Sequence, residues 1–222
     1  FGNHALVNNS TESDNSAFGM TALQNNVSGN YNTAVGTYAL LNNNESYNTG
    51  LGFASLYYNS TGTRNTAAGF ASLNYNSTGN DNAAFGYDAL RENTASNNSS
   101  FGSQAMKNNN QGADNSAFGT NALFSNVSGE GSTAIGAGAL TNNTASYNTA
   151  VGSYSLTMNS TGEQNVAVGR AALSSNVSGW SNTACGFDAP IASNANSNSA
   201  FGRFALHSNT SGNNNTAVGA DA

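Results

Sequence analysis

The chain has 222 residues, of which 7% are charged and only one is proline, and its formal net charge is −6. An acidic chain with five Lys and Arg residues has no basic patch, which argues against nucleic-acid binding. No apolar run approaches the length of a membrane-spanning helix, so we expect no membrane insertion. A composition rich in Asn, Ser, Thr and Gly is typical of disordered chains, but a strict internal period argues against disorder here.

A marker glycine recurs along the whole chain at spacings of 17, 17 and 16 residues, after which the order repeats. These spacings produce a second period of 50 residues, seen from Gly2 to Gly52. The short units differ from the long ones near their ends, where the long units usually carry Ser-Gly, as at Ser28-Gly29. The marker glycines are Gly2, Gly19, Gly36, Gly52, Gly69, Gly86, Gly102, Gly119, Gly136, Gly152, Gly169, Gly186, Gly202 and Gly219.

Each unit, such as "YNTAVGTYALLNN" at residues 31–43, is predicted to form one coil of an all-β parallel solenoid, a β-roll. A glycine in the apolar part and an Asn-rich second half disfavour a helix, whereas short β runs between turn residues fit. We expect two short strands per coil and about 13 coils, stacked roughly 4.8 Å apart into a rod of roughly 60 Å. The alternative is one wide turn per 50-residue cassette, which we reject because so few large apolar residues could not fill it.

Residues 1–222 are therefore predicted to be a single β-solenoid repeat region. The sequence starts and stops inside a repeat, so we expect a fragment of a longer protein without its caps.

Two columns of large apolar residues are predicted to make the core. The apolar column is the residue directly before each marker glycine, and the leucine column is the fourth residue after it. About two large side chains per coil cannot stabilise a coil alone, so stability has to come from stacking. The predicted core residues are Phe18, Leu23, Val35, Leu40, Leu51, Leu56, Phe85, Leu90, Phe118, Leu123, Ile135, Leu140, Val151 and Leu156.

Asparagine fills two further columns, one opening each unit and one closing its second half. Asn accepts turn conformations, and stacked Asn amides can bond one another from coil to coil. We interpret these residues as structural ladders rather than as ligand binders. The predicted ladders contain Asn26, Asn32, Asn43, Asn48, Asn59, Asn65, Asn76 and Asn82.

Charged residues avoid the Asn-Thr-Ala-apolar-Gly segment, the Ala-Leu pair and the closing Asn, so these columns are predicted to be buried or in contact. Two of them are small, and strand alternation would turn them outward if the apolar column points inward. This pattern favours a homo-oligomer, a trimer, with the alanines at the seam between chains. The alternative is a tight bend inside one coil. The alanines concerned are Ala17, Ala34, Ala39, Ala84, Ala89, Ala134 and Ala139.

Four aromatic residues in the loops, Tyr31, Tyr47, Tyr147 and Trp180, are candidates for contact with a glycan or another surface. They are equally compatible with ordinary cover of the rod.

No catalytic pattern stands out. His4 and His207 lie at opposite ends and in different columns, and Cys185 occupies the apolar column, where we expect a buried hydrophobic role. The sequence has no Gly-x-Ser-x-Gly elbow, phosphate-binding loop or calcium-binding nonapeptide repeat. We therefore expect no enzyme activity, no cofactor and no metal.

The segments "NTAVGxxAL" and "NSAFGxxAL" resemble the "SVAIGxxA" repeats of trimeric autotransporter adhesin (YadA-like) heads. Residues 59–86 also resemble the repeat stalks of tail-fibre-like surface proteins that end in an endosialidase-type chaperone domain. The resemblance, which covers essentially the whole chain, implies a left-handed β-roll and side-by-side packing of three chains. The units here are longer than the adhesin repeat, and Thr or Ser often stands where the adhesin has Val.

These observations predict a non-enzymatic adhesive or structural fibre segment, on a cell surface or a virion, that contacts a glycan or protein receptor. One alternative is a glycan-binding rod. Another is an ice-binding solenoid that uses its Thr and Asn columns, although alternation from an inward apolar column would turn the threonines inward too. The threonines of that column are Thr33, Thr49, Thr66, Thr133, Thr149, Thr183 and Thr216.

Overall fold

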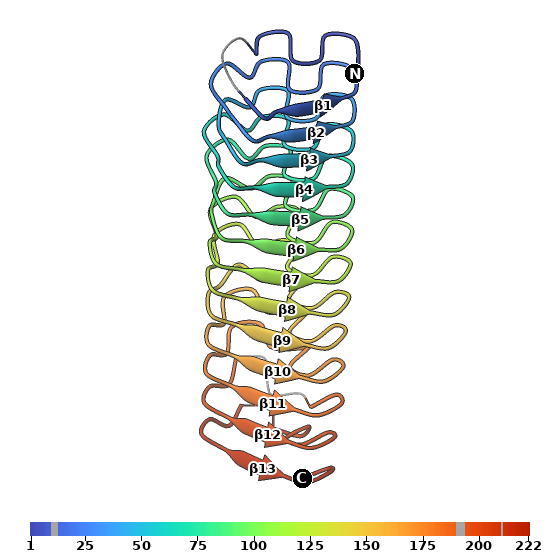
Figure 1. The fold of residues 1–222 in the computed structure, drawn as a ribbon. Coiled ribbons are helices and arrows are strands. Elements are labelled where there is room, and N and C mark those ends of the chain that lie inside the picture. The colour runs from blue at the N-terminus through green and yellow to red at the C-terminus, as the bar shows by residue number, and fades with distance from the viewer. Residues whose placement is uncertain (10–12, 190–193, 210) are drawn as a thin grey trace.

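The computed structural model describes residues 1–9, 13–189, 194–209 and 211–222, and in this part of the chain all regular secondary structure is β. Thirteen strands form one sheet in strict chain order and stack in a single column along a rod (Figure 1). The strands are β1 (Ser16–Phe18), β2 (Thr33–Val35), β3 (Thr49–Leu51), β4 (Thr66–Ala68), β5 (Ala83–Phe85), β6 (Ser99–Phe101), β7 (Ser116–Phe118), β8 (Thr133–Ile135), β9 (Thr149–Val151), β10 (Val166–Val168), β11 (Thr183–Cys185), β12 (Ser199–Phe201) and β13 (Thr216–Val218).

Every neighbouring pair of strands is parallel and in register, so equivalent repeat positions lie directly above one another. In the pair β2 and β3, for example, Thr33 lies opposite Thr49, and Val35 lies opposite Leu51. Neighbouring strands are one unit apart in sequence, which confirms the parallel solenoid with one unit per coil and excludes a turn made of a whole 50-residue cassette.

The second strand that we expected in each coil is absent from the described coils. The half of the coil after the marker glycine is instead a run of turns, in which Tyr38 and Leu40 both adopt positive φ, at 63° and 52°. Ala39 N donates to Gly36 O at 3.2 Å, and Asn43 N donates to Leu40 O at 3.2 Å. Bonds of this short range bend the backbone, so it cannot be extended. Bonds between coils persist, as from Leu40 N to Ser55 O at 2.9 Å.

The marker glycine makes the sharp bend at the end of each strand. Gly119 has a φ of +137°, and a Cβ added there would lie 2.6 Å from the carbonyl carbon of Gly136 in the next coil. Only glycine combines this backbone conformation with so close an approach between coils. The glycine column is therefore a condition of the coil-to-coil spacing.

In the described coils the interior holds one large apolar side chain per coil, supplied by the leucine column. The predicted core leucines are fully buried, and they are Leu23, Leu40, Leu56, Leu90, Leu123, Leu140 and Leu156. Small residues line the opposite wall. A Cβ added to Gly50, which replaces Ala in β3, would lie 3.2 Å from Cγ of Leu40, so this wall directly contacts the leucines.

Our assignment of the apolar column to the core is wrong. Each strand has three residues, of which only the middle one points inward, so the third residue points outward. Phe18, Val35, Leu51, Phe85, Phe118 and Ile135 are exposed by 36–47%, and Val151 is half-buried.

The alternation in the strand also overturns the placement of the alanines. Ala17, Ala34, Ala84 and Ala134 are the middle residues of their strands, and Ala39, Ala89 and Ala139 precede the leucines. All seven are buried inside the single chain, so they cannot form a seam between chains. The alternative, a tight bend inside one coil, places the alanines inside a single chain as observed, but Ala17, Ala34, Ala84 and Ala134 lie in the middle of strands and not at a bend.

Candidate interaction surfaces

The closing asparagines form a ladder inside the rod. Asn126 Nδ2 donates to Asn109 Oδ1 at 2.7 Å in the preceding coil and to Gly129 O at 2.8 Å in its own coil. Gly129 N donates back to Asn126 Oδ1 at 3.1 Å. Equivalent amide-to-amide bonds join Asn59 to Asn43 and Asn76 to Asn59. The buried amides of these residues are thus bonded to one another and to backbone, whereas Asn176 Oδ1 of the same ladder has no partner among the described residues.

The opening asparagines form a second ladder with a different bonding pattern. Asn65 Oδ1 accepts from Asn82 N in the next coil at 3.0 Å, while Asn65 Nδ2 donates to Gly79 O at 2.8 Å. Ser132 replaces Asn in this column, and its Oγ accepts from Asn148 N at 3.2 Å. The predicted ladders are confirmed, and all eight predicted ladder residues, from Asn26 to Asn82, are buried.

The difference between long and short units is confined to the corner between the two ladders. In a long unit, Asn26 Nδ2 donates to the carbonyl three residues on, at Gly29. In a short unit, Asn43 Nδ2 donates to the carbonyl two residues on, at Glu45. The extra residue of a long unit therefore lies between the closing Asn and the carbonyl that accepts its bond, which is equivalent in the two kinds of unit. The strands keep their register in both.

The outer face of the sheet is a continuous surface along the whole stack of 13 strands. We define the outer face as the apolar column of β1 to β13 together with the residue two positions earlier, which is usually Thr or Ser. Phe85, Phe101 and Phe118 stack along it with ring centroids 4.7 and 4.8 Å apart. No charged residue lies in either column. Cys185 belongs to this face and is exposed, not buried as we expected.

A second group of aromatic residues lies on the turn side of the coils, which is the half of each coil that follows the marker glycine. Phe53 stacks on Phe70, and Phe70 on Tyr87, at 5.2 and 5.3 Å between ring centroids. Tyr57 packs edge-on against Tyr58 at 4.4 Å. Burial raises the pKa of the Tyr57 phenol, and the neighbouring Tyr58 adds to this effect.

Ring stacking reduces the ring surface that the predicted ligand-binding aromatics leave accessible to a ligand. Tyr31 and Tyr47 stack on each other at 5.1 Å with an angle of 7° between their planes, so the facing sides of both rings are covered. The Tyr147 ring lies against Gly131 of the preceding coil, because a Cβ there would be 2.9 Å from Tyr147 Cδ1. Trp180 is half exposed. The four residues are spread over several coils.

Charge pairs lie on the turn side and at the corner between the two ladders. Asp88 is buried, and its Oδ2 forms an ion pair with Lys107 Nζ at 2.9 Å. Arg64 and Asp81 form an exposed pair with Nε and Oδ1 2.6 Å apart. The hydrogen bond from Arg64 lowers the pKa of the Asp81 carboxyl.

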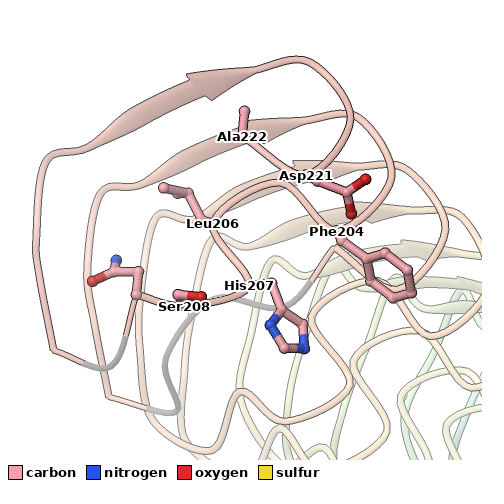
Figure 2. A pocket seen from close by; sticks show the side chains of 7 residues that line it. Phe204, Leu206, His207, Ser208, Asp221 and Ala222 are labelled. Atoms are coloured by element: carbon pink, nitrogen blue, oxygen red, sulfur yellow. The ribbon is translucent and has the colours of Figure 1, made fainter.

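A recess of about 590 Å³ lies at the C-terminal end of the stack, lined by Phe204, Leu206, His207 and Asp221 among others (Figure 2). Leu206 belongs to the leucine column, whose members are covered by the next coil elsewhere in the rod. The recess thus lies at the end of the leucine column, beside the turn-side residues Phe204 and His207.

Among the residues that the structure describes, no group of three or more His, Cys, Asp or Glu side chains could hold a metal ion. None of the described segments is a helix long and apolar enough to cross a membrane. Comparisons of the chain with protein-family models, curated proteins and solved structures returned no match.

Proposed function

We propose that this chain is a non-enzymatic, stiff segment of an adhesive or structural fibre, exposed outside a cell or on a virion. The observation that carries the proposal is the uninterrupted stacking of all 13 strands in one sheet, with two hydrogen-bonded Asn ladders beside it. Stacked backbone and amide bonds resist bending and make length the main property of such a rod. The resemblance of its repeats to adhesin heads supports the same choice.

The proposal predicts both a defined length and attachment. Small-angle scattering should return a rod whose axis is roughly 60 Å for the described coils. Beads carrying the chain through a terminal tag should be retained on glass coated with glycans, with collagen or with an apolar film. Beads carrying a Gly119→Ala variant, which disrupts coil stacking, are the control. Equal retention of both bead types on every surface would contradict the attachment role.

Ice binding remains a second candidate because the threonine column points outward. Thr33, Thr49 and Thr66 lie in register on neighbouring strands of the outer face, which removes the objection based on alternation. The repeat is not uniform, however, since Ala83 and Val166 replace Thr and phenylalanines flank the column.

Thermal hysteresis distinguishes the two candidates. A fibre segment should leave the freezing point at its colligative value. A freezing-point depression that Thr133→Lys abolishes and an exposed turn-side variant retains would instead support ice binding.

A further inference from the structure

The outer face of the sheet is uncovered although its composition is that of a contact surface. Residues of the apolar column are exposed by more than a third in nearly every described coil, and they include Phe101, Ile135 and Phe201. All-parallel sheets are normally covered on both faces, because their strands are apolar on both sides. In this chain only the inner face is covered, by the leucine column.

Charge distribution separates this face from the rest of the surface. The turn side and the corners carry the charged side chains, among them Arg64, Asp81 and Glu130. The outer face is equally accessible to solvent at its apolar column but carries none. Solvent exposure without charge, maintained over 13 strands, is what a surface buried in an assembly requires.

We propose that the outer face packs against the same face of a second copy of this chain. Side-chain rows of a partner stay in step with those of the outer face along its full length only if the partner has the same coil spacing. A second copy of this chain has the same spacing because it has the same fold. Neither copy brings a charge to the contact, so pairing leaves no ion buried and unpaired. Self-complementary contact of one patch is the usual geometry of a two-fold dimer.

The area of the outer face is sufficient for a specific dimer. Thirteen strands at about 4.8 Å make a stripe roughly 60 Å long, and three residues make it about 10 Å wide. Pairing would thus bury roughly 600 Å² on each copy, about 1,200 Å² in total, which reaches the lower range of specific interfaces. The stacked rings of Phe85, Phe101 and Phe118 lie at its middle, where interface energy is concentrated.

This inference deepens the proposed fibre function and rests on it only for its biological meaning. A failure of self-association would leave the rod and its attachment intact, whereas a failure of attachment would leave the dimer intact. The two outcomes are distinguishable because one is measured as mass and the other as bead retention.

Sedimentation equilibrium with a matched pair of variants tests the pairing. The wild-type chain should approach twice its 22.5 kDa mass as its concentration rises. Ile135→Lys should raise the dissociation constant by at least about ten-fold, because it buries a charge at the contact. Val127→Lys changes a similarly exposed β-branched residue at the corner and should leave the dissociation constant unchanged. If the Lys variant does not fold, Ile135→Thr takes its place. Thr is well tolerated in a strand, and this variant should also raise the dissociation constant.

Crosslinking provides an independent readout. β7 is the central strand, so Phe118 of one copy lies at the same height along the rod as its counterpart in both the parallel and the antiparallel in-register dimer. A Phe118→Cys, Cys185→Ala variant should be joined by a short thiol–thiol crosslinker, and a Val127→Cys, Cys185→Ala variant should not. A monomeric wild-type chain at every concentration, or an oligomer that the outer-face variants leave unchanged, would overturn the proposal.

Discussion

The two sides of the interior stabilise the same stack by different means. On one side, leucines such as Leu123 contact a wall of alanines, and the contact is non-directional. On the other side, asparagines such as Asn126 are held by directed bonds to the coil before and to their own corner. Apolar contacts tolerate a change of shape, whereas an amide ladder loses several bonds with a single side chain. A thin rod therefore obtains cohesion from one side and alignment from the other.

The largest loss of stability is expected for a substitution that pushes neighbouring coils apart, because the leucine side and the asparagine side then lose their contacts together. Gly119→Ala should destabilise the coils around β7 by more than about 4 kcal/mol, because the added Cβ meets the backbone of Gly136 and φ stays at +137°. Hydrogen exchange of the amides in β6 to β8 measures this loss locally, which suits a repeat protein whose coils can open separately.

The control for the glycine variant is Gly219→Ala. Gly219 has a φ of +133°, but a Cβ there meets only Ala222 Cβ at 3.7 Å. Its cost should thus be limited to backbone strain of about 1–3 kcal/mol. If the two variants lose equal amounts of stability, the close approach between coils at Gly119 contributes nothing to the cost of the substitution.

On the apolar side, Leu123→Ala should cost about 2–5 kcal/mol, since it leaves a cavity in a column that has one large side chain per coil. Leu156→Met is the matched control, because Met106 already fills this column while fully buried, and it should cost less than about 1.5 kcal/mol. Chemical denaturation followed by circular dichroism compares the two. A Met variant as unstable as the Ala variant would argue that leucine shape, and not apolar volume, is required.

On the polar side, Asn126→Ala should cost about 1–3 kcal/mol, because it leaves Asn109 Oδ1 and both backbone groups of Gly129 without this partner. Asn142→Ala, at an exposed position, should change stability by less than about 0.5 kcal/mol. If both variants unfold at the same denaturant concentration as the wild type, the ladder aligns the coils without stabilising them.

An acidic variant sharpens the contrast by making the polar side respond to pH. Burial beside the Gly129 carbonyl would raise the pKa of the carboxyl in Asn126→Asp above its value in the unfolded chain. The folded state then binds the proton more tightly, so the variant should be least stable at neutral pH and should regain stability as the pH falls. Thermal melts at about pH 7 and about pH 4.5 measure this, with Asn142→Asp as the exposed control.

The smallest effect is expected outside both sides, at the exposed pair of Arg64 and Asp81. The arginine lowers the pKa of Asp81, so the contribution of the pair is present above the unfolded pKa and is lost as the pH falls through the folded pKa. Asp81→Asn should remove this part of the pH dependence and change stability little at high salt. Thermal melts at low and high ionic strength compare the variant with the wild type, and a large loss that persists at high salt would contradict a screened surface pair.

The sequence supports the prediction of those features whose signals are local. The period, the leucine column and the two Asn ladders follow from residue types that recur in fixed positions, and the corner that distinguishes short units is visible from Ser28-Gly29. The direction of the apolar column could not be predicted in this way. Val35 and Ala34 alternate in either orientation, and the choice depends on the interior volume left after Leu40 is placed.

The second strand shows why local patterns fail at turns. Alternating small and large residues around Tyr38 and Leu40 are typical of a strand, but both adopt positive φ, which β-propensity does not predict. Leu in the left-handed region is unfavourable on its own, and bonds such as Leu40 N to Ser55 O in the next coil offset that strain. The conformation is therefore a property of the stack.

The corner that accommodates one residue more or less has a consequence for how such a molecule can vary. Because the strands keep register whether a coil has 16 or 17 residues, a duplicated or deleted cassette of 50 residues alters no contact except at its two joints. Each such event would change the reach of the molecule by about 14 Å and leave its cross-section unchanged. The length of the rod can thus change in steps of one 50-residue cassette, through duplication or deletion of the corresponding stretch of the gene.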